Sequence, residues 1–380
     1  MKTSIKIFTS TKQLPEHWDT LAVDNAFLST AYLEILEKSA PENMRCFFIS
    51  YFQEENLVGI SLSQFLNLNQ LSSFGERDKC LKSSIRNFML KNICSHVLII
   101  GNNMLTGQNA FLFSDKVAHN SIFELIENTA SELKILLKKQ GIKVHLTNFK
   151  DFSAEDVNRF GAEKLKGYYS FSIQPNMVFD IPKEWKLQQD YIDALSKKYR
   201  DQYKRARKKA IDIEKRKLNL SEIIDNEDTI NDLYSHVAKN APFNTFFLAK
   251  NHFSTFKRLM KDQFLFYGYF IDNKLIGFNT LVKNGKVMDT YFLGYDESIQ
   301  REKMLYLNML YDMVMYSIHK DFDEIILART ALEIKSAVGA KPQEMFGFIK
   351  HCNPIINRFI SHFFCYLEPK VEWQERNPFK

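Results

Sequence analysis

The sequence lacks the features that would place the chain in a membrane or in an oxidising compartment. No apolar run approaches the roughly 20 residues that a membrane-spanning helix needs. The N-terminus lacks the apolar core and small-residue cleavage site of a signal peptide. The five cysteines are odd in number and form no C-x-x-C pair. We therefore expect a reduced, cytoplasmic protein without a transmembrane segment or a structural zinc site.

Short motifs of several enzyme classes are absent as well. No pair of histidines has metal-ligand spacing, and neither a G-x-S-x-G sequence nor a Walker-type loop occurs. His351 precedes Cys352, but this adjacent pair has no third partner in the sequence and is weak evidence for a nucleophile. We expect no metal in the site.

The chain has what an ordinary globular protein of two domains requires. Its 380 residues are 45% hydrophobic and 25% charged, so each domain can bury a core of its own. Many of the 33 phenylalanines lie in strand-like runs, which favours a role in the core over a role in binding.

The positive charge belongs to one segment. The net charge is +6, yet residues 196–217 alone hold eleven Lys or Arg against three acids. From Tyr191 to Ile213 apolar residues recur every three or four positions, which predicts a helix with its cations on the other faces. A row containing Arg200, Lys204 and Arg205 is a candidate for binding a polyanionic substrate, tRNA or lipid head groups. A solvated cationic face is the alternative, and both stay open.

Strand and helix patterns place one α/β unit on each side of this segment. Pro182 ends extended structure, so we predict an N-terminal domain (1–182), a basic connecting helix (183–217) and a C-terminal domain (218–380). The second domain shows strands at 264–271, 275–282 and 287–295, a helix at 303–319, a strand from 325, a short helix stopped by Gly339 and Pro342, and strands near 345–350 and 363–367. The first domain shows a hairpin at 46–65, strands near 97–101 and 143–147 and a helix at 122–139, while residues 72–92 read as a loop or an irregular helix. Glu55–Ser61 and Asn273–Asn279 are a faint internal repeat.

Three stretches carry a resemblance to a known family. Asp272–Phe278 looks like the β2–β3 hairpin of GNAT-fold acyltransferases, and the basic helix 196–209 is similar to the segment that opens the second half of FemAB-like, tandem-GNAT proteins. Ala328–Gly339 resembles their late strand–helix element, in which a Lys and a Gly four residues later recur. The order of these stretches covers most of residues 190–370, and more weakly 1–180.

The resemblance implies a fold and a reaction. The fold is α/β (α+β), with two tandem GNAT-like units, each a mixed, mostly antiparallel sheet flanked by helices. The reaction is transfer of an acyl group from acyl-CoA onto an amine of an envelope, lipid or peptidoglycan-type precursor, carried out by the second unit. Aminoacyl-tRNA is the second choice of donor, because the long coiled-coil insertion of the tRNA-dependent members is missing. The implied partners are a small-molecule or lipid-linked amine and, at the periphery, an anionic membrane; we do not expect nucleic acid.

Residues around two strands are candidates for the chemistry. Asp289 and Tyr291 alternate on one strand, share a face and suit the roles of base and acid. Arg329 leaves the next strand where a phosphate or carboxylate would approach. Glu333 and Lys335 follow on the short helix and complete the predicted substrate-binding set. Ordinary strand residues, an Arg329–Glu333 helix pair and a solvated lysine are the alternatives.

The turn that would hold the pyrophosphate of coenzyme A departs from the family pattern. It has no glycine after Gly294, and its acids would repel a phosphate, although Gln300, Arg301 and Lys303 could compensate as cofactor-binding residues. This departure leaves a second hypothesis open, a catalytically inactive GNAT-like module that binds nucleic acid or an anionic membrane through the basic helix.

Overall fold

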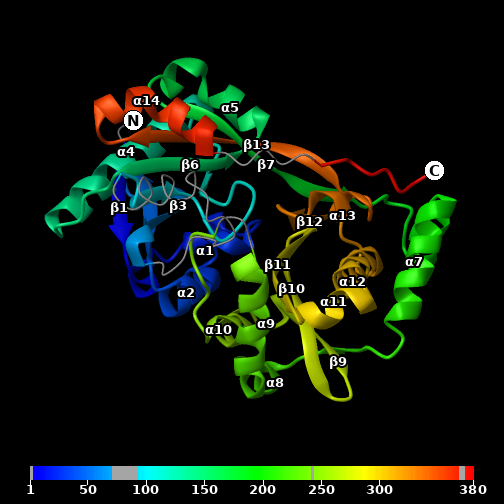
Figure 1. Cartoon of the computed structure of the whole chain (residues 1–380). Coiled ribbons are helices and arrows are strands. Elements are labelled where there is room, and N and C mark those ends of the chain that lie inside the picture. The colour runs from blue at the N-terminus through cyan, green and yellow to red at the C-terminus, as the bar shows by residue number, and fades with distance from the viewer. Residues whose placement is uncertain (1–2, 71–92, 241–243, 368–372) are drawn as a thin grey trace. The chain divides into compact units, whose positions relative to one another are not determined.

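The computed structural model describes residues 3–70, 93–240, 244–367 and 373–380. The chain forms two compact units (Figure 1). Unit 1 takes its described residues from 1–174, 242–249 and 344–371, and unit 2 takes the remainder. The prediction for residues 72–92 lies outside the described residues.

Unit 1 is a mixed sheet with one parallel pair. In the order β1-β2-β3-β4-β6-β13, neighbours are antiparallel except β4 and β6, and β5 pairs separately with β3. Its strands are β1 (Thr3–Phe8), β2 (Met44–Gln53), β3 (Asn56–Asn67), β4 (His96–Ile100), β5 (Phe111–Phe113), β6 (Leu146–Phe152) and β13 (Lys341–His351, from residue 344).

Helices cover this sheet because each has an apolar side. Helix α4 buries Ile122, Ile126, Leu133 and other residues at helical spacing against the sheet, and Gly141, at φ +77°, follows its end. The helices of unit 1 are α1 (Trp18–Leu21), α2 (Thr30–Ser39), α4 (His119–Lys139), α5 (Ala154–Phe160) and α14 (Pro354–Leu367).

Unit 2 repeats this strand order. The sheet runs β8-β9-β10-β11-β12-β7, with one parallel pair, β11 and β12, in the position that β4 and β6 hold in unit 1. Its strands are β7 (Tyr169–Asp180, from residue 175), β8 (Glu214–Lys217), β9 (Phe264–Ile271), β10 (Lys274–Asn284), β11 (Val287–Tyr295) and β12 (Glu324–Ala328). The sixth strand of each unit thus comes from the opposite half of the sequence.

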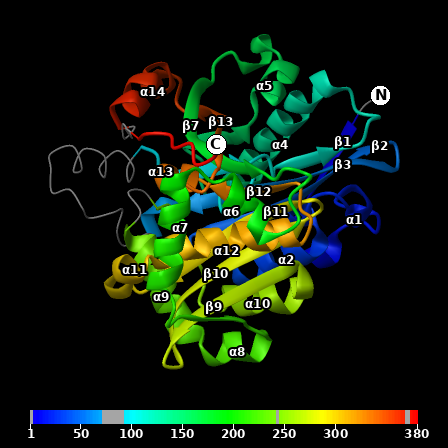
Figure 2. The ribbon, with the colours of Figure 1, turned by 90° about the vertical axis from the view of Figure 1, so that its right-hand side faces the viewer.

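Helices lie on both faces of this second sheet (Figure 2). On one face α6, α7 and α12 bury residues such as Tyr191, Tyr203 and Tyr311 against the strands. On the other, Phe253 and Phe256 of α10 pack on aromatic rings of β9 and β10. The helices are α6 (Gln188–Ala194), α7 (Lys197–Lys209), α8 (Leu220–Asp225), α9 (Glu227–Asn240), α10 (His252–Met260), α11 (Glu297–Lys303), α12 (Leu305–His319) and α13 (Leu332–Ser336).

Tight turns with positive φ close equivalent hairpins in the two units. The β9–β10 turn places Asp272 and Asn273 at φ 49° and 62°, which the right-handed twist of a hairpin favours. In unit 1 the β2–β3 turn lies at Glu54, at φ 56°. The two members of the faint internal repeat therefore occupy the same place in their units.

Several predicted elements were wrong in their bounds or type. The helix predicted from 191 to 213 is two helices, because Leu195 is extended and bridges Phe379. The helix predicted from 303 to 319 begins later, since the left-handed Met304 separates α11 from α12. The strand predicted at 143–147 begins only at Leu146. Residues 363–367 are the end of α14 and not a strand, since a short apolar run fits either structure.

Candidate functional site

The two parallel strands of unit 2 separate in the middle of β11. Their last register pair is Asp289 with Ile326, so the rest of β11 leaves its neighbour. On the other side, β10 pairs Asn279 with Leu293 but Leu281 with Thr290, so β11 holds one extra residue there. The Thr280 hydroxyl donates to the carbonyl of Phe292 at 2.6 Å, fixing this β-bulge. A bulge beside a strand separation opens the sheet and re-aims its side chains.

Tyr291 lies in this bulge and has a histidine partner. Its hydroxyl is 2.9 Å from Nε2 of His252, the first residue of α10, and the two rings stack. His252 is fully buried, and Phe256 packs against Tyr291. The pair joins a phenol to an imidazole across two elements, an arrangement that can pass a proton.

Asp289 lies two residues earlier on β11, at the last register pair. By strand alternation it shares the face of Tyr291. Its side chain is buried, and burial raises the pKa of Asp289 to about 7. Asn284 Nδ2 donates to Oδ2 of Asp289 at 3.1 Å and counters this shift in part, while the charge of Glu324 adds to it. A carboxylate with this pKa suits a general base near neutral pH.

The chain leaves β12 through an unusual backbone. Ala328, Thr330 and Ala331 all have positive φ, at 59°, 65° and 47°. Such conformations are unfavourable for residues with a Cβ, and they cluster at functional sites. They form the turn between β12 and α13 and lead directly to Lys335.

Lys335 is a buried residue of α13 whose side chain reaches back to this turn. Only 5% of the residue is exposed, and its ammonium group donates to the carbonyl of Arg329. Burial lowers the pKa of Lys335 to about 7. An anion that binds beside a buried lysine raises the pKa of that lysine and favours its charged form.

The other residues predicted around this turn have different environments. Glu333 forms an ion pair with Arg376 of the C-terminal segment, and the main-chain N–H of Arg376 donates to the Ser336 hydroxyl at 2.9 Å. Arg329 is half-buried at the end of β12. Glu333 thus binds the C-terminal segment to α13. Lys335 contacts Arg329 through the main-chain carbonyl of Arg329.

In the turn after β11, an acidic side chain of the turn itself binds the N-terminus of α11. Asp296 accepts from the N–H of Ser298 at 2.9 Å and caps α11. Lys303, a predicted cofactor-binding residue, lies 2.6 Å from Asp212. Gln300 is half-buried and Arg301 is exposed on α11. Any diphosphate held here would therefore depend on side chains and not on helix amides.

The three cations predicted on the basic helix separate into two kinds. Arg200 donates to the carbonyls of Ile192, Asp193 and Leu195, at 3.3, 3.3 and 2.8 Å, and so closes the end of α6. Lys204 and Arg205 point outward and are exposed.

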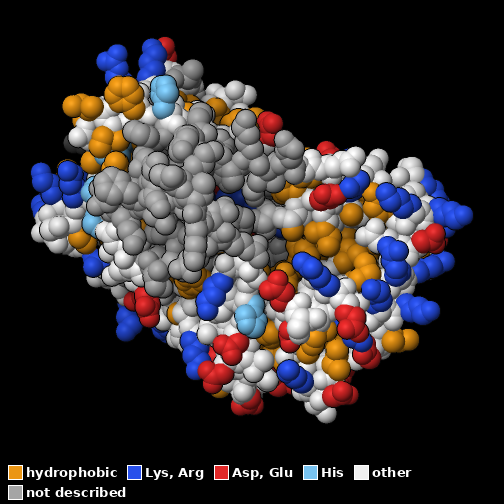
Figure 3. Space-filling model, in the orientation of Figure 1, with side chains coloured by type: hydrophobic (Ala, Val, Ile, Leu, Met, Phe, Trp, Pro, Cys, Tyr) orange, Lys and Arg blue, Asp and Glu red, His pale blue; other side chains and the backbone are white. Residues whose placement is uncertain are grey.

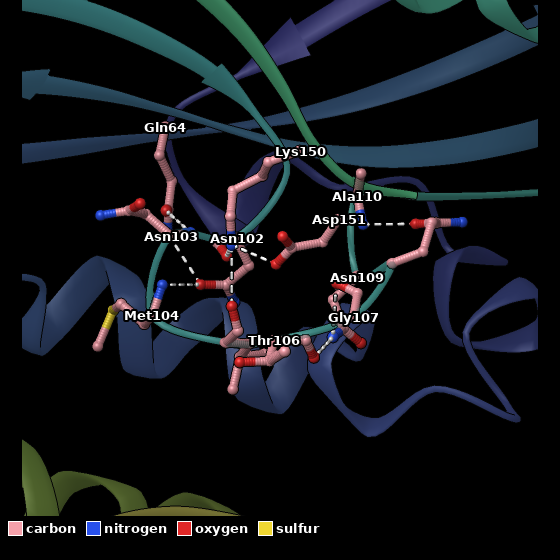
Figure 4. Close-up of polar contacts among 12 residues, drawn as sticks. Gln64, Asn102, Asn103, Met104, Thr106, Gly107, Asn109, Ala110, Lys150 and Asp151 are labelled. Carbon is pink, nitrogen blue, oxygen red and sulfur yellow. Dashed lines mark hydrogen bonds and ion pairs between the residues drawn. The ribbon is translucent and has the colours of Figure 1, made fainter. Parts of the chain in front are cut away.

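The equivalent strand separation in unit 1 holds an internal ion pair (Figure 4). The parallel pair β4–β6 ends at Ile100 and Phe149, and Lys150 follows. The ammonium group of Lys150 is 2.6 Å from the carboxylate of Asp151 and donates to the carbonyls of Asn102 and Leu105 at 3.0 and 2.9 Å. Both charged residues are buried, and Asp151 has φ 66°.

The loop after β4 is fixed around this lysine. Gln64 Oε1 accepts from the N–H of Asn103 at 2.6 Å, and the Asn102 side chain donates to the Tyr32 hydroxyl at 2.8 Å. The N–H of Met104 in turn donates to Asn102 Oδ1 (Figure 4). The loop after β4 is therefore held in place by Lys150, a residue of β6 in the same sheet.

Two solved structures show the same architecture over almost the whole chain. A structure of FemX matches 95% of this chain and 100% of its own, at 10% identity and a TM-score of 0.55. A tandem GNAT protein from the clavulanic acid biosynthesis pathway matches 93% of this chain and 99% of its own, at 10% identity and a TM-score of 0.52. The chain has a tandem GNAT fold. No family model and no curated protein matches its sequence.

The tandem GNAT fold confirms the predicted fold class, and the resemblance to FemAB-like proteins holds for the fold. In unit 2 the strands that separate are β11 and β12, and Arg329 directly follows β12. His252 was not predicted, because it lies 39 residues from Tyr291 and no spacing rule joins a helix start to that strand. Lys150 and Asp151 were missed for a similar reason: a lone Lys–Asp pair in a strand carries no signal of burial.

Two wider observations complete the description of the site. No helix in the described part of the chain is long and apolar enough to span a bilayer. Among the same residues, no group of three or more His, Cys, Asp or Glu side chains is arranged to hold a metal ion.

Proposed function

We propose that this protein is an N-acyltransferase and that unit 2 carries the chemistry. The observation that carries the proposal is the β-bulge at Tyr291, where β11 leaves β12 and the tyrosine meets His252. Unit 1 has the same strand separation, but a buried Lys150–Asp151 pair organises it. Unit 2 places Asp289 and Tyr291 at the separation and Lys335 against the carbonyl of Arg329, just after β12, and burial shifts the pKa of Asp289 and Lys335 to about 7.

The reaction assigned to these groups is aminolysis of an activated acyl group. The amine nitrogen of the acceptor attacks the acyl carbon, a C–N bond forms, and the C–S bond of the thioester breaks. Asp289 takes the proton that the amine loses, and the Tyr291 hydroxyl gives a proton to the leaving sulfur. His252 then gives a proton to Tyr291, and the proton that Asp289 took replaces the one that His252 gave, so each group regains its starting state. Lys335 and Arg329 hold an anionic part of a substrate.

The proposed donor is acyl-CoA. The tandem GNAT protein of the clavulanic acid pathway is described in a form without AcCoA, which associates that donor with the fold. In this chain Asp296 caps α11, so Gln300 and Arg301 would have to hold the diphosphate. We therefore expect weak donor binding that is sensitive to salt. An aminoacyl ester of tRNA is the alternative donor, with a C–O bond broken in place of C–S.

The proposed acceptor is an amine of an envelope, lipid or peptidoglycan-type precursor, and the proposed location is the cytoplasm. The acceptor class rests on the resemblance of Ala328–Gly339 to FemAB-like proteins.

A donor and acceptor screen with matched variants tests the proposal. Purified protein is incubated with acyl-CoAs or charged tRNA and a panel of amines, and new amides are detected by mass spectrometry. Tyr291→Phe should lower kcat by about 10²-fold, whereas Tyr295→Phe, near the end of the same strand, should leave kcat unchanged. Equal activity of both variants would remove Tyr291 from the mechanism. Amide formation that needs Lys150 but not Tyr291 would move the chemistry to unit 1.

A further inference from the structure

The outward face of helix α7 is strongly cationic. Tyr199, Tyr203 and Ala206 form the buried side of the helix in the core of unit 2. The spacing of an α-helix puts the remaining cations in two adjacent rows on the opposite side. The first row is Lys197, Lys204 and Lys208, the second is Lys198, Arg205 and Lys209, all six are exposed, and Asp201 is the one acid among them. Figure 3 shows blue Lys and Arg side chains along the edge where Figure 1 places α7.

A different cation of α7 takes part in the packing of unit 2, whereas the cations of the two rows are exposed to solvent. Arg207 binds Asp312 at 2.7 Å and lies over the ring of Tyr311, so it docks α7 onto α12. Within the part of the chain that the structure describes, Lys204, Arg205 and Lys208 make no ion pair. The ion pairs described in unit 2 therefore do not use the charges at these three positions.

The first turn of α7 gives a second sign that its charge does not serve the helix. Lys197 and Lys198 occupy that turn, no acid accompanies them, and Ser196 makes no side-chain cap. Cations at a helix N-terminus are unfavourable because they face the positive end of the helix dipole. A sequence that only needed a stable, solvated helix would place these charges elsewhere.

An exposed isoleucine follows the helix. Ile211 lies two residues after Lys209, in the turn that leads to β8, and 84% of it is exposed. Among the large hydrophobic residues of the described chain it is the most exposed. It lies directly after the cations that end α7.

We propose that α7 and Ile211 form a docking surface for an anionic lipid bilayer. The headgroups of such a bilayer attract the two cationic rows, and its interface accepts a single apolar side chain. A nucleic acid would satisfy the charges but would leave Ile211 in water, and single strands are commonly bound by stacking on aromatic rings. The tyrosines of α7 lie on its buried side. The inference does not depend on the proposed activity, but it would bring unit 2 to lipid-linked amines.

Vesicle co-sedimentation of the full chain tests this surface. Vesicles are made of phosphatidylcholine alone or of phosphatidylcholine with phosphatidylglycerol, at low salt. We expect binding only to the anionic vesicles, and a loss of binding at high salt. Replacing Lys204, Arg205 and Lys208 together with Gln should weaken partitioning about a hundredfold, since each cation near an anionic surface contributes about fivefold.

Two further variants make the outcome decisive. The matched control replaces Lys12, Lys138 and Lys139, exposed cations of unit 1, with Gln and should bind vesicles like the unaltered chain. Ile211→Asn, which removes the apolar side chain without adding a charge, should weaken vesicle binding several-fold and leave retention on immobilised DNA unchanged. The docking surface is refuted by equal binding to neutral vesicles, by no binding, or by equal losses in the α7 and control variants. Salt-sensitive DNA binding through α7 without vesicle binding would also refute it, in favour of nucleic acid. Circular dichroism and thermal unfolding confirm that each variant is folded.

Discussion

The ring of Phe379 lies where Gly339 would carry a side chain. A Cβ on Gly339 would be 2.5 Å from Cε2 of Phe379, and Gly339 has φ +106°. Phe379 stacks on Phe179 and meets Trp185 and Tyr191 edge-on. Two features therefore favour glycine at position 339. Its backbone has a positive φ, and the ring of Phe379 leaves no room for a side chain.

Gly339→Ala should destabilise unit 2 by roughly 2 kcal/mol or more, because the methyl group adds a clash to the strain of a positive φ. Gly141→Ala is the matched control, since Gly141 also has positive φ but nothing lies within 4 Å of its Cβ position. It should cost about 1 kcal/mol. Urea unfolding measures both, and equal losses would show that the contact with Phe379 carries no energy.

Phe379→Ala should remove about 2 kcal/mol of stability from unit 2, because the half-buried ring leaves a gap among aromatic side chains. Combined with Gly339→Ala, it should cost less than the sum of the two single changes, because the clash disappears with the ring. A double-mutant cycle in urea measures this coupling. An additive result would contradict the proposed contact.

Activity should follow a bell-shaped pH profile centred near neutrality. Asp289 must be ionised to act as a base, so kcat/KM should rise as pH passes its pKa of about 7. Lys335 must be protonated to hold an anion, so kcat/KM should fall as pH passes its pKa of about 7. In Lys335→Arg, which keeps the charge, the alkaline limb should move well above pH 9. A profile without an acid limb would remove Asp289 as the base.

Asp289→Asn should be more stable than the parent chain at pH 8 and similar to it at pH 3. The carboxyl has a raised pKa in the folded state, so the unfolded state loses its proton first as pH rises from about 4 to about 7. The parent chain therefore loses up to about 4 kcal/mol across this window, and the variant lacks that loss. Glu302→Gln, an exposed acid of α11, is the control and should leave the pH dependence unchanged.

Lys335→Met should lower activity and raise stability at pH 7. The folded state loses the lysine proton near pH 7 and the unfolded state near 10.5, so the parent chain gains stability as pH rises through this window. Below it, the buried charge is a cost that methionine avoids. Lys341→Met, at an exposed position, should change neither property. Thermal unfolding at several pH values checks the sign, and a destabilised Lys335→Met variant would contradict it.

Lys150→Met should destabilise unit 1 by about 3–5 kcal/mol, because Asp151 would be left as an unpaired buried charge. Adding Asp151→Asn removes that charge and keeps a residue that tolerates positive φ, so part of the loss should return. Urea unfolding followed by hydrogen exchange in β6 makes the comparison. No recovery in the double variant would show that the lysine matters for its hydrogen bonds and not for its charge.

Local patterns in the sequence determined the elements and much of the fold. The alternating patterns at 264–271, 275–282 and 287–295 predicted three strands, and the structure has β9, β10 and β11 there. The same patterns failed where a single residue interrupts a helix. The sequence near Leu195 and Met304 does not predict that Leu195 is extended or that Met304 is left-handed. Local propensity is a weak guide where the tertiary structure sets the backbone conformation.

The candidate site depended more on the tertiary structure. Alternation along one strand was enough to suggest Asp289 and Tyr291, since neighbours on a strand are neighbours in space. His252, the β-bulge and the burial of Lys335 come from packing between distant segments, which no local spacing encodes. The charge of α7 was readable in the sequence. Only the structure showed that Arg200 donates hydrogen bonds to main-chain carbonyls, whereas Lys204 and Arg205 are exposed. The sequence does not show which side of a helix is covered by the rest of the fold.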